Sequence, residues 1–108
     1  MRMVTAVLLR RSGGAGTEGE AHLVDELLRS HAVPEHGVER LRVRPAPEGI
    51  GLVAFVRAET EPRALISVRA LLAAAHAPLH AFGYTVAAVR SGRPLPGSPT
   101  DSLTRRAS

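Results

Sequence analysis

Residues 38–58 read V-E-R-L-R-V-R-P-A-P-E-G-I-G-L-V-A-F-V-R-A and predict a β-hairpin. In the first half, charged and aliphatic residues alternate strictly, in the order Arg40, Leu41, Arg42, Val43 and Arg44. Strict alternation is typical of a strand with one face in water and the other in the core. Pro45 to Gly49 has the composition of a turn, and Ile50 to Ala58 is apolar on both faces. The stretch therefore predicts a half-buried edge strand joined to an interior strand.

The segment before this hairpin predicts a strand and a helix. Met3 to Leu9 is a short aliphatic run that ends at two arginines and a Gly-rich turn. Thr17 followed three residues later by Glu20 is a capping-box signature. Apolar residues then recur at helical spacing until a proline and a glycine end the pattern. We expect a first strand over residues 3–9 and a helix over residues 18–32.

The segment after the hairpin predicts a second helix and a fourth strand. Thr60 is a suitable N-cap for this helix. Its apolar stripe comprises Ala64, Leu65, Val68, Leu71, Leu72 and Ala75. We expect the helix to end at Pro78, because proline disrupts a helix interior. The run A-F-G-Y-T-V-A-A-V, Ala81 to Val89, then predicts the last strand.

The predicted order of elements is β-α-β-β-α-β, which points to an α+β fold. Two right-handed crossovers in this order give a four-stranded antiparallel sheet with two helices on one face, the ferredoxin-like βαββαβ sandwich. Residues 1–91 form this predicted domain. Residues 92–108 carry three of the eight prolines and no apolar periodicity, so we expect them to form a disordered C-terminal tail.

Composition narrows the classes of chemistry. All fourteen basic residues are arginine, and the chain of 108 residues contains no lysine, asparagine, glutamine, cysteine or tryptophan, a bias typical of a high-GC bacterial genome. Without cysteine there is no disulfide, thiolate zinc site, thiol nucleophile or iron–sulfur cluster, and a cytoplasmic location is expected. The apolar runs are shorter than the roughly 20 residues that span a bilayer, so we expect no membrane contact. The N-terminal run predicts a strand and not a signal peptide.

The sheet face opposite the helices is the predicted functional surface. Eight residues are assigned to this open face as partner-binding or ligand-binding candidates: Val7, Arg40, Arg42, Arg44, Val53, Phe55, Arg57 and Tyr84. Together they form an apolar centre surrounded by arginines, which is more apolar surface than a monomer usually exposes. We therefore expect a second copy of the chain, the chain's own C-terminal tail, another protein or a ligand to cover it. Homo-oligomerisation is the simplest of these possibilities, because small domains commonly form symmetric oligomers.

Nucleic-acid binding is not favoured. The segment Glu48 to Phe55 resembles, in part, the RNP1 motif of RNA-recognition motifs, with matching residues at Gly49, Gly51, Val53 and Phe55. The aromatic side chains that stack on bases are missing from most of the required positions. The modest net charge of +4 also favours a solvated edge strand over a phosphate-binding one for the arginine row.

No motif identifies a cofactor, metal or catalytic site. The loop Gly13-Gly14-Ala15-Gly16-Thr17 leads into a helix but matches neither common phosphate-binding fingerprint, and nearby glutamates would repel a phosphate. Histidine pairs at 31/36 and 76/80 lack the further ligands of a metal site. The open face is poor in acids and bases, so whether the protein is an enzyme stays uncertain, with a non-enzyme favoured.

Two functional hypotheses follow from these patterns. The first is a non-catalytic accessory or regulatory interaction module that self-associates or docks on a protein partner through its open sheet face. The alternative is a small-molecule-binding plait, similar in topology to ACT domains or dimeric α+β barrels and possibly a small biosynthetic enzyme. No motif distinguishes between them, because topology does not carry function.

Overall fold

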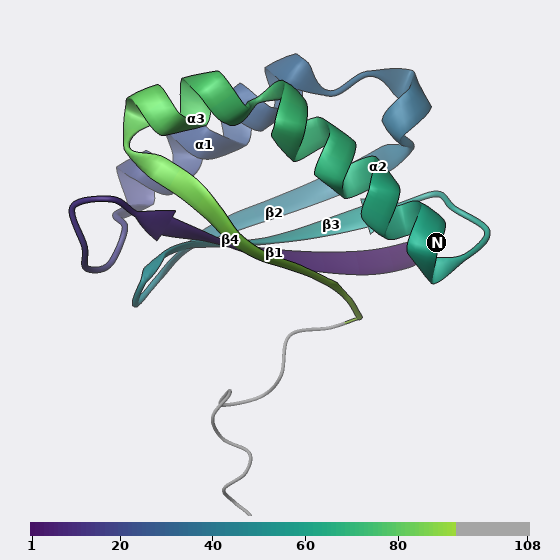
Figure 1. Ribbon diagram of the computed structural model, residues 1–108, viewed down its shortest axis with the longest axis horizontal. Coiled ribbons are helices and arrows are strands. Elements are labelled where there is room, and N and C mark those ends of the chain that lie inside the picture. Colours follow the sequence, from purple (N-terminus) through teal and green to yellow (C-terminus); the bar gives the residue numbers. More distant parts are fainter. Residues whose placement is uncertain (93–108) are drawn as a thin grey trace, which may run out of the picture.

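The computed structural model describes residues 1–92 as an α+β fold with one open, four-stranded antiparallel sheet (Figure 1). The strands are β1 (Arg2–Arg10), β2 (Val38–Ala46), β3 (Gly49–Val56) and β4 (Tyr84–Ser91), in the spatial order β2-β3-β1-β4. The helices are α1 (Glu18–His31), α2 (Glu61–Ala74) and α3 (His76–Phe82), and a short 3₁₀ turn, η1, spans Pro34–His36. All three helices lie on one face of the sheet, so its other face is left open.

The core lies between the helices and the inner face of the sheet. Along β1, Val4, Ala6 and Leu8 are buried, and β3 contributes alternate residues from Ile50 to Val56. The helices cover them with the apolar positions that the helical spacing predicted: Ala21, Val24, Leu28, Ala64, Val68, Leu71 and Leu72. This alternation assigns the odd-numbered positions of β1 and β3 to the open face.

The capping signals in the sequence are confirmed. The Thr17 hydroxyl accepts a hydrogen bond from the Glu20 backbone N–H, and the Glu20 carboxylate accepts one from the Thr17 N–H. Thr60 caps α2 through the backbone N–H of Arg63. Each cap satisfies N–H groups that the first helical turn leaves without an acceptor.

The prediction that one helix ends at Pro78 is wrong. The chain leaves helical geometry at Ala75, whose φ and ψ are −95° and 6°, and a new helix, α3, begins at His76. Pro78 is the third residue of α3, where its missing N–H costs no hydrogen bond because the first-turn donors have no intrahelical acceptor. The described part of the chain therefore has three α-helices instead of the two expected.

The last strand starts later than predicted. Ala81 and Phe82 belong to α3, which ends at Gly83 in the left-handed conformation, and β4 runs from Tyr84 to Ser91. The register of β4 against β1 shifts between Val7 and Leu8, where β4 contains one extra residue, Ala87. Because a bulge changes the parity of a strand, one alternation rule does not describe the whole of β4.

The C-terminal end of the described residues lies beside β1. The backbone N–H of Gly92 donates to the carbonyl oxygen of Met3 over 2.8 Å. The predicted tail from residue 93 onward lies outside the described residues. Within residues 1–92, no single helix is long and apolar enough to cross a membrane; α2 and α3 together pass that test only across a 58° bend, and the apolar side of α2 is buried in the core.

Candidate functional site

The strand register arranges the open face in transverse rows. One row crosses the sheet from Arg44 through Gly51 and Val7 to Ala88. The next runs from Arg42 through Val53 and Thr5 to Arg90. A third begins at Arg40 and passes through Phe55 and Met3. In the first two rows, the edge strand β2 carries Arg44 and Arg42, the edge strand β4 carries Ala88 and Arg90, and the two central strands carry uncharged residues.

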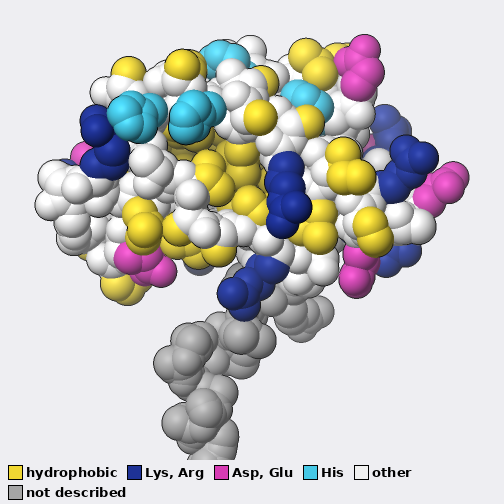
Figure 2. Space-filling view, in the orientation of Figure 1, with side chains coloured by type: hydrophobic (Ala, Val, Ile, Leu, Met, Phe, Trp, Pro, Cys, Tyr) yellow, Lys and Arg dark blue, Asp and Glu magenta, His cyan; other side chains and the backbone are white. Residues whose placement is uncertain are grey.

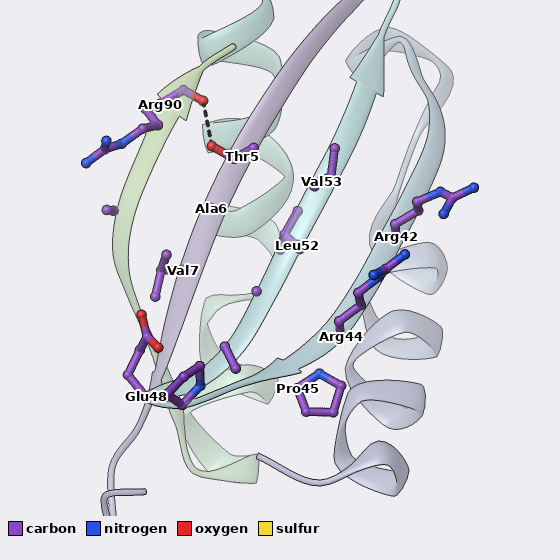
Figure 3. A pocket seen from close by; sticks show the side chains of 14 residues that line it. Thr5, Ala6, Val7, Arg42, Arg44, Pro45, Glu48, Leu52, Val53 and Arg90 are labelled. Carbon is purple, nitrogen blue, oxygen red and sulfur yellow. Dashed lines mark hydrogen bonds between the residues drawn. The ribbon is translucent and has the colours of Figure 1, made fainter. Parts of the chain in front are cut away.

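The first two rows enclose a hollow of about 740 Å³ on this face, here called the open-face groove (Figure 3). Its floor is formed by Thr5, Val7, Gly51, Val53 and Ala88, its rims carry Arg42, Arg44 and Arg90, and Pro45, Pro47 and Glu48 close one end. Thr5 is only 8% exposed and its hydroxyl lies 3.5 Å from the Arg90 carbonyl oxygen. The groove therefore combines an apolar floor with guanidinium groups at both sides.

The rim arginines are not neutralised by carboxylates of the described residues. The ion pairs in residues 1–92 are Arg10–Glu20, His22–Glu26, Arg29–Asp25 and Arg57–Glu39, and none includes a rim residue. Arg42, Arg44 and Arg90 are exposed, and Figure 3 shows Arg42 and Arg90 extending from opposite edges, away from one another. Their hydrogen-bond donors are thus available to carboxylates or phosphates from outside.

Gly51 lies on the floor of the groove, and the fold does not require glycine there. Its φ is not in the left-handed region, unlike that of its neighbour Gly49 at 153°. A Cβ at position 51 would meet only the Cβ of Ala46, at 3.9 Å, which is an ordinary van der Waals contact. Glycine in a strand interior weakens the strand. Gly51 therefore leaves an empty space above the sheet and lowers the stability of β3.

The contrast with Gly16 shows what a structural glycine looks like in this protein. A Cβ at Gly16 would collide with the Gly49 carbonyl oxygen and lie 2.9 Å from the Tyr84 hydroxyl. The Gly16 backbone N–H also donates to that carbonyl over 2.9 Å. Gly16 is thus fixed by close packing, whereas Gly51 is not.

The structure brings most of the predicted open-face residues together. Val7, Arg42, Arg44 and Val53 line the groove. Arg40 and Phe55 lie on the same face in the adjacent row, where Arg40 is exposed and Phe55 is half-buried. Arg57 follows the end of β3 and forms an ion pair with Glu39 over 3.2 Å, so it does not belong to the groove.

The assignment of Tyr84 to the open face is wrong. Tyr84 pairs with Arg10 on the helix side of the sheet and is 1% exposed. Its hydroxyl donates to the Glu20 carboxylate over 2.9 Å, which ties β4 to the start of α1. Burial and this hydrogen bond raise the pKa of Tyr84 to about 12. The hydrogen bond from Tyr84, with those from the Thr17 backbone and Arg10, holds the pKa of Glu20 below its usual value.

Several residues that line the groove were absent from the predicted site, among them Gly51, Ala88 and Arg90. Gly51 had a signal, because glycine inside an otherwise apolar strand is unusual. No local pattern indicated that Ala88 and Arg90 lie on the open face, because the face to which they belong depends on the bulge at Ala87.

The Gly-rich loop and the histidines do not form further sites among the described residues. Glu20, at the start of α1, accepts hydrogen bonds from the Arg10 guanidinium and from the Thr17 N–H. These two donors beside the Gly-rich loop therefore already have an acceptor within the protein. Residues 1–92 contain no group of three or more potential metal ligands. His76 and His80 are tilted neighbours with ring centroids 6.1 Å apart.

A second, smaller hollow of about 460 Å³ lies between α2 and β4. It is lined by Arg69, Leu72, Ala73, His76, Val86 and Val89. Figure 2 shows hydrophobic side chains gathered between the helices and the sheet on this side of the molecule. The hollow contains one arginine and no acidic side chain, so it offers fewer polar contacts than the open-face groove.

Comparisons with protein-family models, with curated proteins and with solved structures find no match to this chain.

Proposed function

We propose that this domain is a non-catalytic interaction module that docks on a protein partner through the open-face groove. Three features support the proposal: an apolar floor about two strands wide, exposed arginines at both edges, and an empty space above Gly51 near the hairpin end of the floor. Protein interfaces commonly combine an apolar centre with a polar margin, and arginine is enriched in them. The module acts in the cytoplasm, in keeping with its cysteine-free composition.

The empty space above Gly51 carries the proposal. A strand-interior glycine that neither φ nor crowding requires reduces stability without a structural benefit. Its benefit lies in what the space admits, namely an anchoring side chain of the partner. Such anchors, seated in central pockets, contribute most of the binding energy of many interfaces.

The fold we propose is the ferredoxin-like plait. The strand order β2-β3-β1-β4 with every neighbouring pair antiparallel supports it, because β1 and β2 then run in the same direction on either side of β3. The same relation holds for β3 and β4 on either side of β1.

Charge favours a different protein over a second copy as the partner on this face. Stacking two open faces would bring Arg40, Arg42, Arg44 and Arg90 of one chain toward the same four of the other. Glu48 is the single acidic residue among those that line the groove. Like charges brought together at an interface oppose binding, so an acidic partner surface is the better complement.

The proposal is tested by exchanging charge on one face at a time. We would express tagged Arg42→Glu/Arg44→Glu and, as a matched control, Arg63→Glu/Arg69→Glu on the exposed side of α2, in the cells that naturally produce the protein. Both variants change the net charge equally. A partner retained by wild type and the α2 variant, but lost by the groove variant, supports docking through the groove. Equal retention by both variants contradicts it.

A second candidate function is the binding of an anionic metabolite with an apolar body. The groove volume of about 740 Å³ lies within the 300–1,000 Å³ typical of ligand sites. In this case a ligand bound to wild type raises its melting temperature by mass action, and Gly51→Val removes the shift. The absence of any shift across a panel of anionic metabolites contradicts this alternative.

A further inference from the structure

We infer that the open-face groove binds an acidic amphipathic α-helix of the partner, lying along β1 and β3 with its apolar stripe on the groove floor. The inference rests on the proposed docking function and specifies the partner segment.

The width of the groove fits one helix. Neighbouring strands lie about 4.8 Å apart, so the two edge strands are about 14 Å apart across the sheet. An α-helix with its side chains is about 10–12 Å in diameter. A helix above the two central strands therefore lies between the edge arginines, and the opposite face of this sheet already packs against helices.

The length of the floor sets the spacing of the apolar stripe. From the row of Arg40, Phe55 and Met3 to the row of Arg44, Gly51 and Val7 is four residues along the strands, or about 13 Å. At 1.5 Å per residue this distance matches about nine helical residues. Three apolar side chains at positions i, i+3 or i+4, and i+7 then reach the floor, one of them above Gly51.

The charges of the rims set the flanks of the helix. Arg40, Arg42 and Arg44 lie along β2, and Arg90 lies on β4 at the other edge. None of the four forms an ion pair within residues 1–92. A complementary helix carries Asp or Glu on both sides of its apolar stripe, with more acidic residues on the side that faces β2.

Other occupants fit the groove less well. An extended segment binds a sheet by pairing its backbone with an edge strand, and the open face offers no free backbone groups. Single-stranded nucleic acid requires stacking aromatics, and Phe55 is the one aromatic residue of the described open face.

The test uses synthetic peptides as probes against the purified full-length chain. The first is a 16-residue helical peptide with leucine at the stripe positions and glutamate on both flanks. The second has the same composition in an order that destroys the stripe. Binding is measured by fluorescence anisotropy and mapped by amide chemical shifts. We expect the stripe peptide to bind at least tenfold more tightly than its permuted control, and to shift the amides of Val7, Gly51, Val53 and Ala88.

Variants of the domain complete the test. Arg42→Glu/Arg44→Glu and Gly51→Val are each expected to weaken binding of the stripe peptide at least tenfold, whereas Arg63→Glu/Arg69→Glu changes it less than twofold. Equal binding of both peptides overturns the inference. An oligouridylate probe that binds more tightly than the stripe peptide, and whose binding is lost in the Arg42→Glu/Arg44→Glu variant, also overturns it. If the stripe peptide fails but the groove variant still releases the cellular partner, the helix inference falls and the docking proposal stands. If the stripe peptide does not bind and the groove variant also retains the cellular partner, both the helix inference and the docking proposal are overturned.

Discussion

Filling the hollow at Gly51 is expected to make the domain more stable and less able to dock. Gly51→Val places a β-branched side chain on a strand whose backbone accepts it, and the new Cβ meets only the Cβ of Ala46 at 3.9 Å. Removing the entropic cost of a strand-interior glycine is expected to raise the free energy of unfolding by about 0.5–1 kcal/mol. For a domain of this size that gain corresponds to an increase in melting temperature of about 2–8 °C.

In the proposed complex, the same substitution occupies the space that admits the partner's anchoring side chain. Loss of a buried anchor costs about 2 kcal/mol or more, which weakens binding about 30-fold. The assay is competition: purified variant displaces tagged wild type from the captured partner complex, so the partner need not be identified. About 30-fold more Gly51→Val than wild type is expected to be needed for half displacement.

Gly51→Ala is the control, because its single methyl group leaves most of the hollow empty. It is expected to compete nearly as well as wild type. A Gly51→Val domain that unfolds more easily than wild type would show that the position is crowded after all. A Gly51→Val domain that competes as well as wild type would show that the hollow is not used.

Three further perturbations test separate parts of the account. First, the pKa of Tyr84 is raised from 10.0 to about 12, so the folded state holds its phenol proton more tightly than the unfolded chain, and stability falls as the pH rises from about 10 to about 12. The chain has one tyrosine and no lysine, so denaturation across this pH range is expected to show the fall in the free energy of unfolding in wild type and not in Tyr84→Phe. Identical pH dependence of stability in the two proteins would refute the assignment of the raised pKa to Tyr84. Second, Ile50→Ala is expected to cost about 2–5 kcal/mol because Ile50 is fully buried, whereas Phe55→Ala on the open face costs about 1 kcal/mol; similar costs in urea denaturation would contradict the assignment of faces. Third, partner docking is expected to weaken between low and high salt because the rim arginines are exposed, and a salt-independent affinity would argue against charge recognition.

Local signals in the sequence were sufficient for the strands of the hairpin and for the starts of both long helices. The alternation of Arg40 to Arg44 indicates an edge strand directly, because side chains of a strand alternate between its faces. Thr17, Glu20 and Thr60 indicate where helices begin, since their side chains satisfy nearby backbone donors. These features depend on neighbours a few residues away.

The errors arise where a local rule has two outcomes. Pro78 was interpreted as the end of a helix, but proline is also compatible with the first turn of a new one. Gly83, in the left-handed conformation at the end of α3, was the better signal for the boundary with β4. Starting the last strand at Ala81 placed the end of α3 in the sheet.

The candidate site was predicted on three strands and missed on the fourth. The parity of β1, β2 and β3 follows from their apolar alternation, so Val7, Arg42, Arg44 and Val53 were assigned correctly to the open face. The bulge at Ala87 reverses the parity of β4, which places Tyr84 in the core and Arg90 on the rim. A bulge depends on the register between distant strands, and no local pattern reveals it.

Correcting the position of Tyr84 also changes which mutations are informative. Tyr84→Ala would remove a buried aromatic side chain and its hydrogen bond to Glu20, at a cost of about 3–5 kcal/mol. Any loss of binding in such a variant would reflect unfolding. Gly51, Val53 and the rim arginines are the positions where binding is separable from stability.

Thiol footprinting in an extract of the cells that naturally produce the protein tests the central claim most directly, because the chain contains no cysteine of its own. We would compare Val53→Cys, in the groove floor, with Ile66→Cys, which lies on α2 and is 66% exposed. Docking through the groove predicts that the Val53→Cys thiol reacts with a maleimide more slowly in the cell extract than in the purified protein. The Ile66→Cys thiol is expected to react at the same rate in both settings. Equal rates for Val53→Cys in the two settings, or protection of Ile66→Cys instead, would contradict the assignment of the open face as the docking surface.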